Sequence, residues 1–233
     1  MHLRTLTLTT LLAAALLAAG QPPLSASAHG ASHPTSAREG SVGAADLLAK
    51  VKSCTQISHG RYRTDTGSRA TVPVCGTKGA VFWKADIDID CDGRRTAKCN
   101  ERTDPSFHPD TAFHQSDGRP LRSDTLPYVV VPGASGIWNH ARSGIKGGGV
   151  VAVIHGRQVQ YAVVGDTGPT KIIGEASYAT ARALGLNPDP ATGGAASGVT
   201  YILFKNSQVS PIESHTAAVT EGERLAKRFL RDN

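Results

Sequence analysis

The hydrophobic pattern of the chain predicts short β-strands separated by turns. Five runs are rich in β-branched or aromatic residues and are bounded by turn-forming residues, as buried or half-buried strands are. These runs span residues 80–84, 128–131, 150–155, 160–164 and 200–204. The third and fourth runs flank Gly156-Arg157-Gln158, which predicts a hairpin. The body of the protein is therefore expected to be β-rich.

Helical spacing of apolar residues is found in three stretches, at residues 44–51, 176–186 and 216–230. Pro188 follows the second stretch at a distance typical of a helix end. The Gly-rich stretch 192–198 predicts a loop, and it lacks the Lys-Ser/Thr ending of a phosphate-binding loop. A few helices on a β-rich body indicate the α+β class.

The first 28 residues have the pattern of a secretory signal peptide. A short basic start precedes an apolar run at residues 11–20, and Ala26-Ser27-Ala28 offers small residues for cleavage. The run is shorter than the roughly 20 apolar residues that a membrane-spanning helix needs, although a retained N-terminal anchor stays an alternative. We expect residues 1–28 to be a signal peptide, residues 29–43 a flexible lead, and residues 44–233 a single secreted domain.

Composition serves mainly to exclude function classes. The chain has 233 residues, of which 39% are hydrophobic and 5% aromatic, and its formal charge is +6. Because no dense block of Lys and Arg accompanies this charge, a nucleic-acid partner is not expected. We also expect no membrane association of the mature protein, no cofactor, and a monomer.

Four cysteines in an exported protein most often form two disulfides. The simplest pairing joins neighbours and closes two short loops, Cys54 with Cys75 and Cys91 with Cys99. A zinc site has little support, because no Cys-x-x-C pair and no histidine pair stand at ligand spacing. An even count also leaves no spare thiol for a cysteine nucleophile.

Alternate aspartates form an acidic cluster in the middle of the chain. If this segment is extended, Asp86, Asp88 and Asp90 share one face, and Ile87 and Ile89 share the other. The cluster could be a calcium site, a trough for a cationic ligand, or a solvated turn. The glutamate that closes the helix–loop–helix calcium motif is missing, so the sequence predicts no metal ligand set, and these interpretations stay open.

Two further acids stand where a cleft is expected. Asp166 follows a β-run that ends at Gly165, and Glu175 comes nine residues later, at the start of the predicted helix. Paired carboxylates suit glycoside hydrolysis, in which one acid protonates the leaving oxygen and the other activates water. The structural alternatives are a turn-forming Asp and a Glu favoured by the dipole of a helix N-terminus.

Four ordered motifs carry a family resemblance. FWKADIDIDCDG, TDPSF, LPYVVVP and YAVVGDTGPTKIIGEAS resemble the secreted chitosanases of glycoside hydrolase family 75. The resemblance implies an endo-acting, inverting hydrolase of the β-1,4 bonds between glucosamine residues of chitosan. It also implies that Asp166 and Glu175, in the GDT and GEAS motifs, are the two essential acids.

A looser similarity extends to secreted wall-lytic enzymes built on a six-stranded double-psi β-barrel. It implies such a barrel-like core here, with Glu175 as general acid and Asp166 as the base, although these two roles could be exchanged. Two alternatives remain on the same barrel: a peptidoglycan-cleaving lytic enzyme, or an expansin-like carbohydrate-binding protein.

The implied substrate gives the other candidates a role. Chitosan is a polycation while its amines are protonated, so Asp86, Asp88 and Asp90 are expected to supply counter-charge in its binding cleft. The aromatic residues Tyr128, Trp138 and Tyr161 are candidates to stack on sugar rings, with burial in the core as the alternative.

Overall fold

The computed structural model describes residues 39–233. The predicted signal peptide and residues 29–38 of the predicted lead lie outside this range. The helices and strands follow one another as α1 (Ala44–Ala49), β1 (Thr55–Gln56), β2 (Cys75–Thr77), β3 (Ala80–Asp90), β4 (Tyr128–Pro132), the 3₁₀ helix η1 (Ala141–Ser143), β5 (Val150–His155), β6 (Gln158–Gly168), β7 (Glu175–Ser177), α2 (Tyr178–Ala183), β8 (Ala195–Phe204) and α3 (His215–Asp232).

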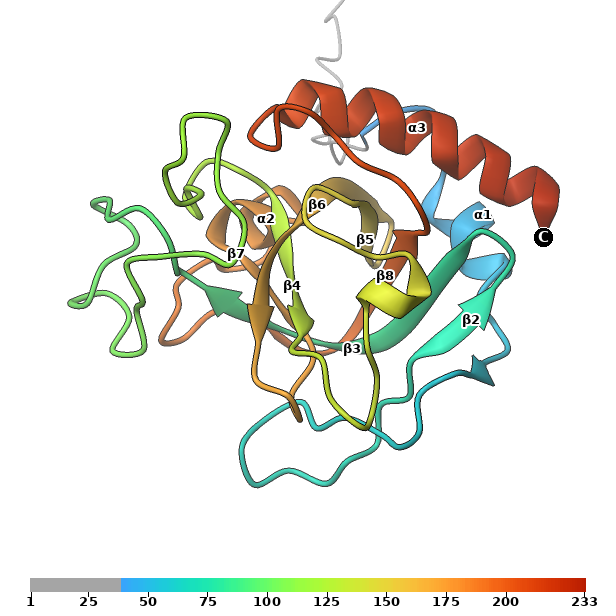
Figure 1. Cartoon of the computed structure of the whole chain (residues 1–233), viewed down its shortest axis with the longest axis horizontal. Coiled ribbons are helices and arrows are strands. Elements are labelled where there is room, and N and C mark those ends of the chain that lie inside the picture. The colour runs from blue at the N-terminus through green and yellow to red at the C-terminus, as the bar shows by residue number, and fades with distance from the viewer. Residues whose placement is uncertain (1–38) are drawn as a thin grey trace, which may run out of the picture. The chain divides into compact units, whose positions relative to one another are not determined.

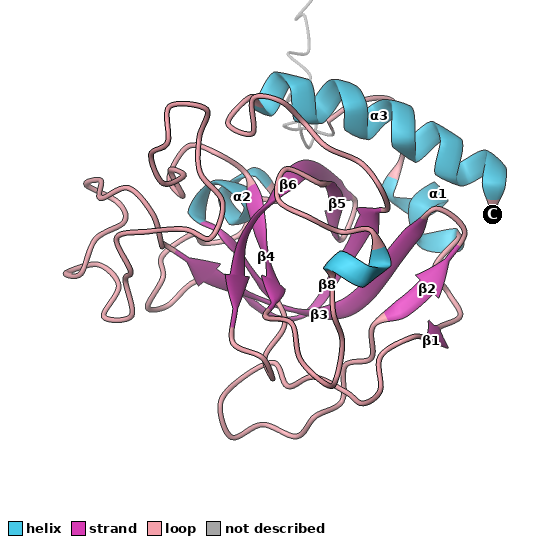
Figure 2. Ribbon diagram, viewed as in Figure 1, coloured by secondary structure: helices cyan, strands magenta, loops and turns pink. Residues whose placement is uncertain are grey.

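Six strands close into a barrel (Figures 1 and 2). Their order around the ring is β3-β7-β4-β6-β5-β8, and the pairing of β8 with β3 completes it. The β3–β7 and β4–β6 pairs are parallel, and the other pairs of the ring are antiparallel. Strands β1 and β2 extend the sheet beyond β3. The prediction of a β-rich protein with a barrel-like core and few helices is confirmed.

Alternation of side chains along the strands divides the apolar residues into two clusters. One cluster includes residues from all six barrel strands and fills the interior: Trp83, Val131, Val153, Val164, Ala176 and Tyr201 are among them. The other cluster packs the outer surface of the barrel against α1 and α3, through Leu47, Leu225 and Phe229. Figure 1 shows α3 running across one side of the barrel, with α1 beside it. Strand β4 and residues 150–154 of β5 are apolar, as expected for strands with both faces buried.

The predicted strands and the hairpin between β5 and β6 are confirmed, but several boundaries differ. Strand β3 continues past residue 84 to Asp90, so the acidic cluster is extended and is not a turn. The predicted helix 176–186 begins only at Tyr178, because β7 pairs with β3 and Ser177 then caps α2 through the Thr180 amide. The predicted loop 192–198 contributes its last residues to β8.

Both predicted disulfides are formed. The Cα atoms of Cys54 and Cys75 are 5.1 Å apart, and those of Cys91 and Cys99 are 5.0 Å apart. The second bridge fixes the chain directly after β3. Glu39, in the predicted lead, accepts hydrogen bonds from the barrel residues Gln160 and Tyr161. Within the described residues, no helix combines the length and apolar character needed to span a bilayer.

Candidate active site

A β-bulge points the side chain of Asp166 out of the barrel. In the parallel pair of β4 and β6, Val129 pairs with Val164 but the next residue, Val130, pairs with Asp166. Gly165 is therefore the extra residue, and bulges of this kind redirect side chains near functional sites. Val164 lies in the interior cluster, whereas Asp166 shares the outward face of Val130. A side chain at Gly165 would collide with Tyr128, so this position requires glycine.

Backbone amides fix the Asp166 carboxylate. Its Oδ1 atom accepts hydrogen bonds from the N–H of Thr167 (2.7 Å) and the N–H of Ala112 (2.8 Å). Ala112 belongs to the long excursion between β3 and β4, the loop of residues 91–127. Burial raises the pKa of Asp166 above its usual value, and these two amides oppose that rise. The hydrogen bonds favour the ionised form of this acid.

Glu175 occupies a different electrostatic environment at the start of β7. It pairs with Asp88 of β3 in the parallel ladder, and its Oε2 atom lies 2.6 Å from the point where a Cβ of Gly168 would stand. Burial raises the pKa of Glu175 to about 7, helped by the charges of Asp88, Asp92 and Asp166. Within the described part of the chain, no group donates a hydrogen bond to this carboxylate. Its protonated form is therefore favoured.

Both acids line one cavity of about 370 Å³. Its wall is formed by the ends of β3, β6 and β7, by the excursion between β3 and β4, and by the loop before β8. Six carboxylates line it, and among the described residues its lining includes no Lys, Arg or His. The six are Asp88, Asp90, Asp92, Asp104, Asp166 and Glu175.

Burial and mutual repulsion raise the pKa values of these carboxylates. Burial raises the pKa of Asp92 to about 6, with the charge of Asp166 adding to the rise and the His108 amide opposing it. Burial also raises the pKa of Asp90 well above its usual value, and the neighbouring Asp92 raises it further. Like charges this close repel unless a cation or a proton compensates. The cavity is thus a strongly negative site suited to a cationic ligand.

The acidic strand only partly fulfils its predicted role. Asp88 and Asp90 line the cavity, while Ile87 and Ile89 belong to the interior apolar cluster, as the predicted alternation requires, and Ile89 also borders the cavity. Asp86 does not line this cavity, and its side chain is buried. Its predicted contact with substrate is therefore not supported by its position.

The three predicted stacking residues are core residues. Tyr128 and Tyr161 are fully buried between the barrel and its outer layer, and the Tyr128 hydroxyl donates to the Asp92 carbonyl. Trp138 is 4% exposed, packs edge-to-face on Trp83 and donates its indole N–H to Ser143. None of the three lines the cavity. Their burial does not support the prediction that they stack on sugar, because Tyr128 and Tyr161 lie on barrel strands and pack in the outer cluster, and Trp138, in the loop after β4, packs in the interior cluster.

Several cavity residues were not predicted from the sequence. Asp92 and Asp104 stand within the motifs DIDIDCDG and TDPSF, which was the available signal. Asp104 accepts a hydrogen bond from the Ser106 amide. This bond stabilises the turn that places Asp104 and Ser106 at the cavity. The backbone segment around Pro190, Ala191 and Gly193 completes the wall, and no local pattern marks it.

Comparison with known proteins now identifies the family. A family model described as fungal chitosanase of glycosyl hydrolase group 75 matches residues 87–229, more than half of the chain. The chain belongs to this family. No curated protein matches it.

Membership of the chitosanase family confirms the family resemblance and the expectation of a glycoside hydrolase. The matched range includes the candidate pair Asp166 and Glu175, five of the six barrel strands in full, and β3 from Ile87 onward. It also includes the whole excursion that carries Asp92 and Asp104. A chitosanase acts on a polysaccharide, and the acidic cavity is compatible with that substrate class.

Proposed function

We propose that the protein is a secreted endo-chitosanase that hydrolyses β-1,4 bonds between glucosamine residues with inversion of configuration. The observation that carries this proposal is the cavity itself, where six carboxylates gather without a cationic side chain among the described lining residues. Residues 1–28 act as the signal peptide, and residues 44–233 form the single catalytic domain. The two disulfides suit an oxidising compartment.

Charge favours a polycationic substrate over other wall polymers. Protonated glucosamine units meet Asp88, Asp90, Asp92 and Asp104 along the cavity. An anionic polymer such as peptidoglycan would meet the same carboxylates with repulsion. The overall charge of +6 does not prevent binding, because charges beyond about 8–10 Å are screened at moderate salt whereas the local carboxylates act at contact.

The environments of the two acids suggest their roles. Glu175 has a raised pKa near 7 and no hydrogen-bond donors among the described residues, so it holds the proton and donates it to the departing glycosidic oxygen. Asp166 accepts two amide hydrogen bonds that favour its ionised form. It takes the proton of a water molecule that attacks the anomeric carbon from the opposite face.

Strand geometry supports room for that water. The Glu175 carboxylate lies over Gly168, two residues beyond Asp166 on β6. The Cα atoms of residues i and i+2 of a strand are about 6.6 Å apart, so the two carboxylates reach the cavity beside different points of β6. Inverting enzymes separate their carboxyl groups by roughly 6.5–9.5 Å, whereas retaining enzymes need about 5–5.5 Å. The family resemblance favours inversion, so the mechanism we propose places a water molecule between the two acids.

The direct test measures the release of reducing ends from chitosan, peptidoglycan and cellulose in parallel. We expect rapid release from chitosan, little from cellulose and none from peptidoglycan. A fall in viscosity that precedes substantial release of sugar marks internal cleavage. Release from peptidoglycan but not chitosan would support the lytic-enzyme alternative, and binding without release would support the carbohydrate-binding one.

A further inference from the structure

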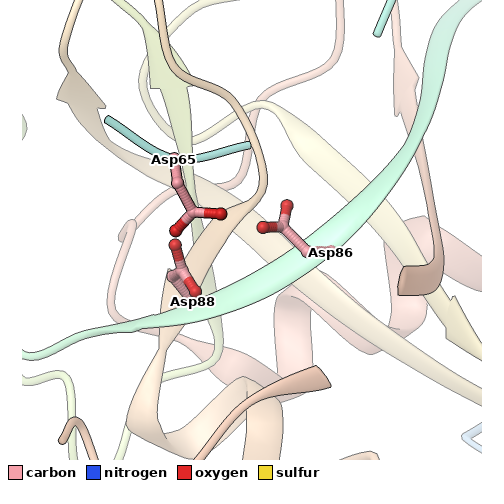
Figure 3. Close-up of side chains that lie close together, drawn as sticks. All are labelled: Asp65, Asp86 and Asp88. Atoms are coloured by element: carbon pink, nitrogen blue, oxygen red, sulfur yellow. The ribbon is translucent and has the colours of Figure 1, made fainter. Parts of the chain in front are cut away.

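Three aspartates converge beside the cavity, on the far side of Asp88 from Asp90. Asp86 and Asp88 come from β3, and Asp65 comes from the loop between β1 and β2 (Figure 3). One carboxylate oxygen of each lies within 4.8 Å of the others. Figure 3 shows the Asp86 carboxylate directed toward the other two. Asp65 and Asp86 do not line the catalytic cavity, and Asp88 lies between this cluster and the cavity.

One carboxylate oxygen of Asp86 is buried without a hydrogen-bond partner in the described structure. Asp86 is 4% exposed, and this oxygen is its Oδ1 atom. A buried carboxylate oxygen without a donor is strongly disfavoured. Room for this oxygen comes from Gly174, where an added Cβ would lie 1.9 Å from it. Gly174 has a φ of +116°, a conformation that glycine adopts readily.

Nothing among the described residues neutralises the cluster. No ion pair of the described chain includes Asp65, Asp86 or Asp88. Asp86 and Asp88 are alternate residues of β3, so the strand holds their side chains on one face. A cation would compensate both the charge and the unpartnered oxygen.

The loop that presents Asp65 is held by backbone contacts. The Asp65 amide donates to the Ser68 hydroxyl. Two residues earlier, Arg63 pairs with the segment that leads into β7, through Arg63 N–H to the Lys171 carbonyl and Ile173 N–H to the Arg63 carbonyl, both 3.0 Å. In the same segment, the Gly174 carbonyl accepts a hydrogen bond from the Asp88 amide at 2.8 Å. The cluster thus joins three chain segments next to Glu175.

We propose that Asp65, Asp86 and Asp88 bind a calcium ion. Calcium takes six to eight oxygen ligands at 2.3–2.6 Å, so two ligands of one ion are at most about 5.2 Å apart, which the cluster satisfies. Magnesium is usually held by only one or two carboxylates, and zinc prefers nitrogen and sulfur ligands. Water and backbone carbonyls complete the shell. The ion fastens the Asp65 loop to β3 and the linker before Glu175, and it acts structurally.

Isothermal titration of calcium chloride into the chelator-treated full chain tests this proposal. We expect one ion per chain with a dissociation constant below about 1 mM, as in extracellular modules, and a higher thermal midpoint when calcium is present. Asp65→Asn should weaken binding at least tenfold and abolish the thermal shift. Asp46→Asn, which removes an exposed acid of α1, should leave both unchanged.

The controls keep the result decisive. Circular dichroism checks that each variant folds. If Asp65→Asn does not fold, Asp86→Asn serves as the second ligand variant. Absence of calcium uptake by the wild-type chain, or equal uptake by a folded ligand variant, would overturn the site. Equal binding of magnesium chloride would overturn the calcium assignment. No polysaccharide is present in the titration, so the outcome is independent of whether the protein cleaves chitosan.

Discussion

In the active-site cavity, the Glu175 carboxylate lies where a side chain at Gly168 would stand, so the glycine makes room for the acid. A Cβ at Gly168 would lie 2.6 Å from Glu175 Oε2 and 3.0 Å from Val130. The backbone of Gly168 does not have a positive φ, so alanine is compatible with the strand. The contact therefore controls the position of the acid and not the fold.

We predict that Gly168→Ala preserves folding but lowers kcat on chitosan by about 100-fold, because displacing a catalytic group by about 1 Å can cost this much. Gly136→Ala is the matched control, since nothing lies within 4 Å of its added Cβ. The comparison requires kcat values and thermal midpoints of both variants. Unchanged turnover in Gly168→Ala would show that Glu175 does not need this position.

Substitution of the two acids tests the proposed pair. Glu175→Gln and Asp166→Asn should each fold normally and lose about 100- to 10,000-fold in kcat, the usual contribution of a positioned acid or base. Neither change alters side-chain volume appreciably, so circular dichroism spectra should match the wild type. A folded variant that retains near-normal chitosan cleavage would remove that residue from the mechanism.

The pH dependence of kcat should be bell-shaped. Glu175 must be protonated to act as the acid, so kcat should fall as pH rises through its pKa of about 7. The groups that face it are Asp88 of β3, Asp92 of the following loop and Asp166 of β6, all of which favour its proton. Asp166 must be ionised, so kcat should fall again at acid pH, above the ordinary carboxyl pKa because burial raises it.

Saturating substrate is needed for this measurement, because kcat then reports groups in the enzyme–substrate complex and not the changing charge of free chitosan. The basic limb should track Glu175. An activity that keeps rising well above pH 7 would contradict the assignment of Glu175 as the acid.

The two disulfides should differ in their effect on catalysis. Removing either bridge, as Cys54→Ser/Cys75→Ser or Cys91→Ser/Cys99→Ser, should destabilise the protein by about 2–3 kcal/mol on loop-closure grounds, with the longer first loop at the upper end. Only the second bridge follows β3 at the acidic cavity. We therefore expect kcat to fall only in the Cys91–Cys99 variant, measured well below both thermal midpoints.

Local sequence patterns were sufficient for some features. The run 150–155 and its hairpin partner follow from apolar residues around a Gly turn, and the cysteine pairs follow from short loops. Asp166 and Glu175 could be singled out because a strand end and a nearby acid suggest a cleft, and because their motifs resemble a known family.

Other features depend on contacts between distant segments. The bulge at Gly165 arises from pairing with β4, so the outward direction of Asp166 has no local signal. Burial of Tyr128 and Tyr161 results from closure of the barrel and from α3 packing on it. Asp65 meets Asp86 and Asp88 only because the loop after β1 folds back along the linker before β7.

The anomeric form of the first product tests the central claim most directly. If Glu175 protonates the leaving oxygen while Asp166 activates water from the other face, cleavage of a β-linked glucosamine chain must invert the anomeric carbon. Proton NMR of chitosan oligosaccharides, recorded within minutes of adding enzyme and before mutarotation, should show the α-anomer first. Initial appearance of the β-anomer would contradict a water molecule between Asp166 and Glu175.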